Sequence, residues 1–323
     1  MQMSGAAPSP RLSARLVLAM LAIIAFPAGL TLHTVRSPAV IEISSANPTP
    51  HGYSWSLLLF IVPIAVIGGW FLPSEQVPIP KRAFWLTLAI LVPIGFGLDF
   101  FFANRFFKFP NPGATLGIGA PALGGSIPVE EYVFYFTGFL AVLLLYVWSG
   151  EYWLAAYSEP DYPGAARKIG RLLGFHPTSL VVGLALIAAA IAYKKFFSPF
   201  PDGFPNYFIA LVVGSTIPSV GLLPAARPFI NWRALSLTLF MILLISLFWE
   251  ATLAVPYGWW GYEPQQMLGL FIGAWAGLPL EAVLVWISVT YTTTIVYEVL
   301  KVRLAACDRG SDGSAAGSSD EVI

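Results

Sequence analysis

The stretch SIPVEEYVFYF spans residues 126–136. It places two adjacent carboxylates, Glu130 and Glu131, at the head of an apolar run that is typical of a membrane-spanning helix. An ionisable side chain inside a membrane segment is costly unless it is paired, hydrated or neutralised by a proton. Each such acid is therefore a candidate functional residue, and the rest of the chain shows how many more there are.

The composition places the whole chain in the class of membrane proteins. Of its 323 residues, 57% are hydrophobic and only 11% are charged, and the mean hydropathy is +0.74. The formal net charge is zero, so nothing favours binding to nucleic acid. We expect apolar partners instead, namely membrane lipid and a hydrophobic substrate. The single cysteine, Cys307, excludes a disulfide within the chain.

Eight segments approach the length of about 20 apolar residues that a helix needs to cross a bilayer. The predicted spans are residues 12–33, 53–73, 82–103, 128–149, 178–197, 206–225, 234–256 and 277–300. The first run lacks a clear cleavage site, so we interpret it as a retained helix. If the N-terminus is cytoplasmic, 12 of the 17 Lys and Arg residues lie in cytoplasmic segments. The positive-inside rule thus predicts a multi-pass protein of the cell membrane with both termini in the cytoplasm.

An internal repeat appears when the chain is shifted by 151 residues. The segment RAFWLTL (82–88) then aligns with RALSLTL (233–239) without a gap. The same register pairs acids, namely Asp99 with Glu250 and Glu130 with Glu281. One further helix lies between the two units, so both enter the membrane in the same direction. The predicted fold is an all-α polytopic membrane bundle of about eight transmembrane helices with two parallel three-helix repeats.

The repeat divides the chain into five parts. They are an N-terminal transmembrane helix and loop (1–52), a first repeat (53–149), a connecting loop with an extra helix (150–205), a second repeat (206–300) and a cytoplasmic tail (301–323). The tail is rich in Gly, Ser and Asp from about residue 307 and is predicted to be disordered. We expect a cavity between the two repeats, on the axis that relates them.

Five acids are the candidate catalytic residues: Glu130, Glu131, Glu281, Asp99 and Glu250. The predicted topology gathers them near the non-cytoplasmic end of the bundle. Pro128 suits the first turn of a helix, which places Glu130 inside that turn. There the helix dipole favours the carboxylate, while apolar surroundings favour the protonated acid. The sequence leaves open whether these acids are proton donors in a hydrocarbon pocket or ordinary caps that face water.

Aromatic residues make up 15% of the chain and crowd the loop-facing ends of the spans. Aromatic faces attract cations, and the same residue types form belts at the membrane interface. The aromatic residues expected at a substrate site are Phe102, Phe134, Tyr135, Trp249, Trp260 and Trp286. The three histidines are scattered, so we expect no metal site. The Gly-rich loop 112–125 lacks the Lys of a phosphate loop and is interpreted as a re-entrant or close-packed connector.

The repeated three-helix plan carries three short motifs, namely FFKF (106–109), IPVEEYVFYF (127–136) and LPLEAVLVW (278–286). With them, the chain over roughly residues 53–300 resembles the lycopene cyclase domain family of integral-membrane carotenoid enzymes, in its fused two-domain form. The resemblance implies a redox-neutral cyclisation of an acyclic carotenoid end group, without an organic cofactor. It also implies a ranking of the acids, with Glu130 and Glu131 first, Glu281 next, and Asp99 and Glu250 as supporting groups.

The second repeat departs from the family pattern, because Ala282 stands where a second Glu is expected. Two other functions therefore stay open. A carotenoid end-group hydratase, or a related isoprenoid-modifying enzyme, would capture the same cation with water and would need a wetter site. A transporter or a non-catalytic lipid-binding protein also uses parallel repeats around a midplane cavity.

Overall fold

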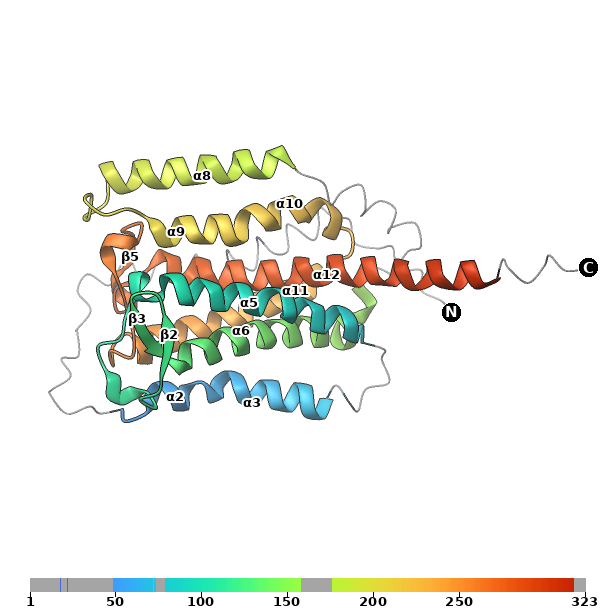
Figure 1. The fold of residues 1–323 in the computed structure, drawn as a ribbon, viewed down its shortest axis with the longest axis horizontal. Helices are drawn as coiled ribbons and strands as arrows, with labels where there is room; N and C mark the ends of the chain where they lie inside the picture. Colours follow the sequence, from blue (N-terminus) through green and yellow to red (C-terminus); the bar gives the residue numbers. More distant parts are fainter. Residues whose placement is uncertain are drawn as a thin grey trace, which may run out of the picture.

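The computed structural model describes residues 49–71, 79–157 and 176–316, together with the single residues 18, 22 and 73. The span expected at residues 12–33 falls, apart from two of its residues, outside the described part. Figure 1 shows the helices lying alongside one another in one bundle. We call residues 49–157 the first half and residues 206–316 the second half.

Seven helices in the described ranges are long and apolar enough to cross a membrane. Their bounds are Gly52–Gly69, Lys81–Phe106, Val129–Trp153, Pro177–Phe196, Asn206–Ala226, Trp232–Ala254 and Leu280–Ala305. They correspond, in order, to the last seven of the eight predicted spans. The prediction of a mostly helical, membrane-spanning protein is confirmed.

Several spans consist of more than one helical element. The first contains α2 (Gly52–Ser56), α3 (Leu58–Val66) and the π-turn η1 (Ile67–Phe71), and the fifth contains α9 (Asn206–Leu211), the π-turn η5 (Val212–Thr216) and α10 (Ile217–Ala226). The others are α5 (Lys81–Phe106), α6 (Val129–Trp148) with η3 (Ser149–Trp153), α8 (Pro177–Phe196), α11 (Trp232–Trp249) with η6 (Glu250–Ala254), and α12 (Leu280–Ala316). A π-turn widens a helix locally and turns the residues that follow it about the axis.

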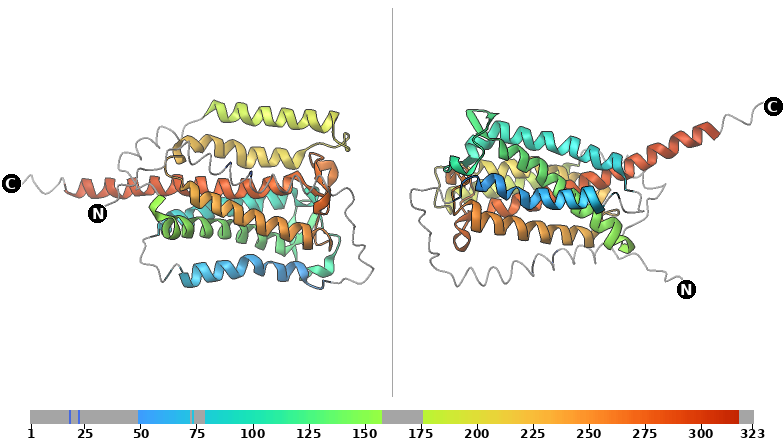
Figure 2. Two further views of the ribbon diagram at one scale, coloured as in Figure 1. Left: turned by 180° about the vertical axis from the view of Figure 1, so that it is seen from behind. Right: turned by 90° about the horizontal axis from the view of Figure 1, so that it is seen from below.

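Helices α6 and α12 form the centre of the bundle. α12 packs against α5, α6, α10 and α11, while α6 packs against α3, α5, α11 and α12. α8 packs on α10 and η5 at the edge of the bundle, as Figures 1 and 2 show. The apolar core contains one large cluster around Leu143 and Ile295 and a second around Trp249 and Trp286.

The described residues form three short antiparallel strand pairs. The labelled strands lie at one end of the bundle (Figure 1). β2 (Gly119–Ala122) pairs with β3 (Gly125–Pro128), β5 (Phe271–Ile272) with β6 (Leu278–Pro279), and β1 (Phe107–Lys108) with β4 (Gly261–Tyr262). The last pair joins a loop of the first half to a loop of the second half by backbone hydrogen bonds. The Gly-rich loop 112–125 leads into the β2–β3 hairpin, where Gly124 has a φ of 86° that glycine adopts at no steric cost.

The local sequence explains where α6 and α11 begin. Pro128 is the N-cap of α6 and the last residue of β3, rather than a residue of the first helical turn. Glu130 lies in the first turn, as predicted, and Glu131 lies there with it. Asn231 caps α11, because its Oδ1 accepts a hydrogen bond of 3.1 Å from the N–H of Ala234. These two helix starts fix the positions along the bundle from which α6 and α11 present their side chains.

The C-terminal tail differs from its prediction. Disorder is predicted from about residue 307, but α12 remains helical as far as Ala316. No proline interrupts residues 301–316, and Leu304, Ala305 and Ala306 are strong helix formers. Because α12 is already nucleated inside the bundle, each further residue extends it without a new nucleation step, even where Gly310 and Gly313 are poor helix formers. Residues 317–323 lie outside the described part.

Lys194, near the end of α8, connects this peripheral helix to a loop of the second half by hydrogen bonds. Its side chain is fully buried, and Nζ donates hydrogen bonds to the carbonyl oxygens of Pro264 (3.0 Å) and Met267 (2.6 Å). The next residue, Lys195, also donates to two carbonyl oxygens, but at the exposed surface. Water can replace the donor at the exposed site and not at the buried one.

We expect the variant Lys194→Met to lower the unfolding temperature of the purified protein in detergent. The buried carbonyl group of Met267 and the partly buried one of Pro264 lose their donor, at a cost of about 1–3 kcal/mol for the buried, unsatisfied group. Lys195→Met is the matched control and should unfold close to the temperature of the unaltered protein. Tryptophan fluorescence during heating measures both, and equal shifts for the two variants would contradict this account of Lys194.

Candidate functional site

A cavity of about 50 Å³ lies between the two halves of the bundle. The first half lines it with Tyr53, Phe107, Glu131, Phe134, Tyr135, Gly138 and Phe139, and the second half with Tyr207, Glu250, Trp260, Tyr262, Val285, Trp286 and Val289. We call this cavity the chamber. Its lining is apolar and aromatic except for two carboxyl groups and the hydroxyl groups of the tyrosines.

Glu131 reaches the chamber from the first turn of α6. Its side chain is 7% exposed, and the hydroxyl group of Tyr53 donates a hydrogen bond of 2.6 Å to its Oε1. Tyr53 belongs to α2 and is itself buried. A residue of the first span, Gly52–Gly69, therefore positions the carboxyl group of Glu131 on the third span, Val129–Trp153, by a hydrogen bond. This carboxyl group therefore has one protein donor in the described part of the chain and lies away from bulk water.

Glu250 reaches the chamber from the other half, at the point where α11 changes into the π-turn η6. The indole N–H of Trp286 donates to Oε1 at 2.7 Å, and the hydroxyl group of Tyr262 donates to Oε2 at 2.5 Å. Burial raises the pKa of the Tyr262 phenol well above its ordinary value, and the Glu250 carboxyl raises it further. Tyr262 therefore remains a hydrogen-bond donor at neutral pH. Both oxygens of Glu250 accept hydrogen bonds, which suits a carboxylate.

Asp99 lines a second cavity, of about 80 Å³, that adjoins the chamber. The two cavities share six lining residues: Phe107, Tyr135, Phe139, Tyr207, Val285 and Val289. The side chain of Asp99 is 1% exposed, and its Oδ2 has no hydrogen-bond partner among the described residues. This burial excludes the interpretation of Asp99 as a group that faces water at the membrane surface.

Glu130 and Glu281 line neither the chamber nor the second cavity. Each accepts a backbone N–H from the loop before its own helix: Leu116 donates to Glu130 Oε1 at 2.7 Å, and Leu268 donates to Glu281 Oε1 at 2.5 Å. The hydroxyl group of Ser54 also donates to Glu130 Oε1. Both acids are buried and hold the loops that cover this end of the bundle, so their contacts are those of positioning residues.

Four of the six aromatic residues expected at a substrate site line the chamber, namely Phe134, Tyr135, Trp260 and Trp286. Trp249 lies behind the wall, with its ring centroid 5.5 Å from that of Phe134 and 4.7 Å from that of Trp260. Phe102 lies apart from this group. It is 37% exposed and stacks on Phe106, with the ring centroids 5.5 Å apart.

The expected substrate-site residues omit three tyrosines that line the chamber, Tyr53, Tyr207 and Tyr262. Tyr53 and Tyr207 both lie near the start of the first helix of a predicted repeat. Tyr207 follows Tyr53 by 154 residues, which is three more than the shift of 151 that reveals the repeat. An ungapped comparison therefore does not pair them, although a comparison of the two helix starts would.

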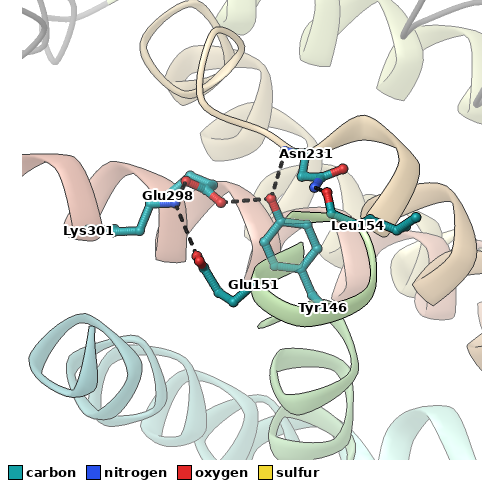
Figure 3. Close-up of polar contacts among 6 residues, drawn as sticks. All are labelled: Tyr146, Glu151, Leu154, Asn231, Glu298 and Lys301. Atoms are coloured by element: carbon teal, nitrogen blue, oxygen red, sulfur yellow. Dashed lines mark hydrogen bonds and ion pairs between the residues drawn. The ribbon is translucent and has the colours of Figure 1, made fainter. Parts of the chain in front are cut away.

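A second buried polar cluster lies where α6 ends and α11 begins (Figure 3). The hydroxyl group of Tyr146 donates to Glu298 Oε1 at 2.7 Å and accepts the N–H of Asn231 at 3.0 Å. Lys301 Nζ lies 2.8 Å from Glu298 Oε2 and 3.9 Å from Glu151 Oε1. Each charged group in this cluster has a partner of opposite sign. The cluster therefore ties both halves together, and its charges are already paired.

Within the part of the chain that the structure describes, no group of three or more His, Cys, Asp or Glu side chains could hold a metal ion. No protein-family model, curated protein or solved structure matches the chain. The geometry of the chamber and the sequence motifs are thus the two observations on which a function can be proposed.

We expect Glu281→Ala to destabilise the protein by about 1–3 kcal/mol, because it leaves the buried N–H of Leu268 without an acceptor. Glu281→Gln keeps an oxygen at the same position and should unfold close to the temperature of the unaltered protein. Thermal unfolding of the two purified variants compares them directly. A Gln variant as unstable as the Ala variant would show that the negative charge, rather than the hydrogen bond, matters at this position.

Proposed function

We propose that the protein is an integral-membrane isomerase of the lycopene β-cyclase kind, which closes the end groups of an acyclic carotenoid such as lycopene to give γ- or β-carotene. The observation that carries the proposal is the chamber, where Glu131 and Glu250 from different halves face one apolar, aromatic space inside a membrane-spanning bundle. The resemblance of the repeated motifs to the lycopene cyclase domain family supplies the reaction and the substrate class.

The three-helix repeat is part of this proposal, and the packing of the helices supports it. α3 packs on α6 as α10 packs on α12, and α6 packs on α11 as α12 packs on α5. This exchange of contacts is expected for two units related by a two-fold axis along the membrane normal. The antiparallel pairing of Phe107 with Tyr262 is consistent with the same axis.

The proposed reaction takes up one proton and releases one proton. A carboxylic acid transfers its proton to a carbon of the terminal double bond, which leaves a carboxylate and a tertiary carbocation. The neighbouring double bond attacks the cationic carbon, forms the new C–C bond and moves the cation into the ring. A carboxylate then takes the adjacent ring proton, and the C–H electron pair becomes the ring double bond. The reaction consumes no oxidant or reductant and needs no organic cofactor.

The hydrogen bonds in the chamber support an assignment of the two proton-transfer roles. Glu250 accepts a hydrogen bond at each oxygen, so it is suited to be the carboxylate that takes the ring proton. Glu131 accepts one hydrogen bond, from Tyr53 to Oε1, and Oε2 is the oxygen that would carry the acidic proton. In this assignment Asp99 is a supporting acid at the adjoining cavity.

The lining of the chamber favours a cyclase over a hydratase. Aromatic faces such as those of Phe134 and Trp286 attract a desolvated cation by about 2 kcal/mol. General acid–base transfer typically contributes about 10²–10⁴-fold, so keeping water from the cation must contribute as well. A hydratase needs water at the same cation, and this apolar wall is poorly suited to hold it.

The proposed function implies particular partners and a location for the protein. Its partners are a hydrophobic carotenoid or isoprenoid and membrane lipid, and its place is the cell membrane. The orientation with both termini in the cytoplasm remains a prediction from the distribution of Lys and Arg.

Expression in a host that accumulates lycopene should yield γ- or β-carotene, which chromatography with visible absorption detects. Glu131→Gln and Glu250→Gln should each lower ring formation by about 10²-fold or more, because each removes a proton donor or acceptor. The matched control is Glu263→Gln, since Glu263 pairs with Lys108 and does not line the chamber. Hydroxylated acyclic products would identify a hydratase, and unchanged pigment with normal protein levels would reject catalysis in favour of lipid binding or transport.

Reaction of the purified protein with lycopene in D₂O should place one deuterium on carbon for each ring formed. The acid that protonates the double bond exchanges with solvent between turnovers, so its proton carries the isotope label of the buffer. Mass spectrometry of the product measures the label, and β-carotene incubated with the protein in D₂O controls for later exchange. Unlabelled rings would exclude a solvent-exchangeable acid as the proton donor.

A further inference from the structure

The second cavity forms a seam between α5 and the segment α9–η5. α5 contributes Ile94 and Leu98, α9 and η5 contribute Leu211 and Gly214, and residues of α6 and α12 form the floor. Ile94 is 48% exposed among the described residues, so the seam opens on the flank of two membrane-spanning helices. The six lining residues that it shares with the chamber make the two spaces direct neighbours.

Hydroxyl groups on one side of the seam satisfy one another. Ser215 Oγ and Thr292 Oγ1 are 2.6 Å apart, and Ser219 Oγ lies 2.8 Å from the same Thr292 atom. Ser215 Oγ also donates to the carbonyl oxygen of Ser288 at 3.3 Å. These hydroxyl groups are occupied within the protein, so apart from Asp99 and the two tyrosines Tyr135 and Tyr207 the lining that the seam offers to a ligand is mostly hydrocarbon.

Two glycines give the seam its shape. A Cβ atom on Gly95 would lie 2.7 Å from the ring of Tyr135 and 2.9 Å from that of Phe139, so glycine lets α5 approach the aromatic floor closely. On the opposite wall, a Cβ atom on Gly214 would have no neighbour within 4 Å. The missing side chain at this second position leaves the seam open.

We propose that the seam binds the linear isoprenoid chain of the substrate while the end group occupies the chamber. The identity of this ligand rests on the proposed function. The chamber measures about 50 Å³ and the seam about 80 Å³, whereas pockets that enclose a drug-sized ligand measure about 300–1,000 Å³. A long polyene therefore has to extend beyond the chamber, and the adjoining seam is the mostly apolar space that would take it to the flank of the bundle. A chain that continues from the seam into the lipid stays out of water.

The test is the retention of lycopene by the purified protein, measured as visible absorption per mole of protein after reconstitution into lipid nanodiscs. In Gly214→Phe the new side chain occupies the open side of the seam, and this variant should retain about tenfold less pigment. A tenfold loss is the effect of displacing about two CH₂ groups from an apolar site. Gly97→Phe is the matched control. Gly97 also lies on a membrane-spanning helix with no atom within 4 Å of its would-be Cβ, but it lines neither cavity, so this variant should retain pigment as the unaltered protein does.

A second variant guards against misfolding of Gly214→Phe. Ala210→Leu adds volume at another point of the same seam and should also lower retention, with an unaltered unfolding temperature. The proposal would be overturned by normal retention in both seam variants, by equal losses in the seam variants and the Gly97→Phe control, or by the absence of retention in the unaltered protein. Pigment that is retained but never cyclised would reject the cyclase and leave the seam in place. Cyclisation at an unchanged rate by Gly214→Phe would reject the seam and leave the cyclase.

Discussion

A carboxyl group that is taken into a hydrocarbon interior needs a hydrogen-bond donor, a proton or an opposite charge, and this requirement shapes the bundle. Tyr53 donates a hydrogen bond to Glu131, while Trp286 and Tyr262 each donate one to Glu250. In each case at least one donor comes from a helix or loop other than the one that carries the acid. The contacts that satisfy the acids therefore also bring distant parts of the chain together around the chamber.

Adjacent residues on one helix perform different tasks in this arrangement. Successive side chains of an α-helix point about 100° apart, so Glu130 holds a loop while Glu131 faces the chamber. In the second half, Glu281 likewise holds a loop. The next residue there is Ala282, so this position supplies no carboxyl group to the chamber. The carboxyl group of the second half in the chamber comes instead from Glu250, at the π-turn of α11. The chamber is thus chemically asymmetric, because its two carboxyl groups come from different positions in the two halves.

Hydropathy and proline positions were enough to predict the helices, because spans of about 20 apolar residues have few alternatives. α8, for example, covers Pro177–Phe196 where residues 178–197 are predicted. The sequence also identified the acids that gather near the chamber. It could not tell which of two neighbouring acids faces inward, because that depends on the rotation of α6 against its partners. Nor could it show that Lys194, near the end of α8, is buried against a loop 70 residues further along the chain.

The central claim is that Glu131 and Glu250 face each other across one small space. Chemical cross-linking tests it directly with the variant Glu131→Cys/Glu250→Cys in a Cys307→Ser background, treated with a short, apolar reagent that alkylates two thiols. Mass spectrometry should find one reagent molecule per protein and no free thiol, whereas the control Glu131→Cys/Glu263→Cys should not be bridged. Two reagent molecules per protein, each attached to a single thiol of the first variant, would contradict the account.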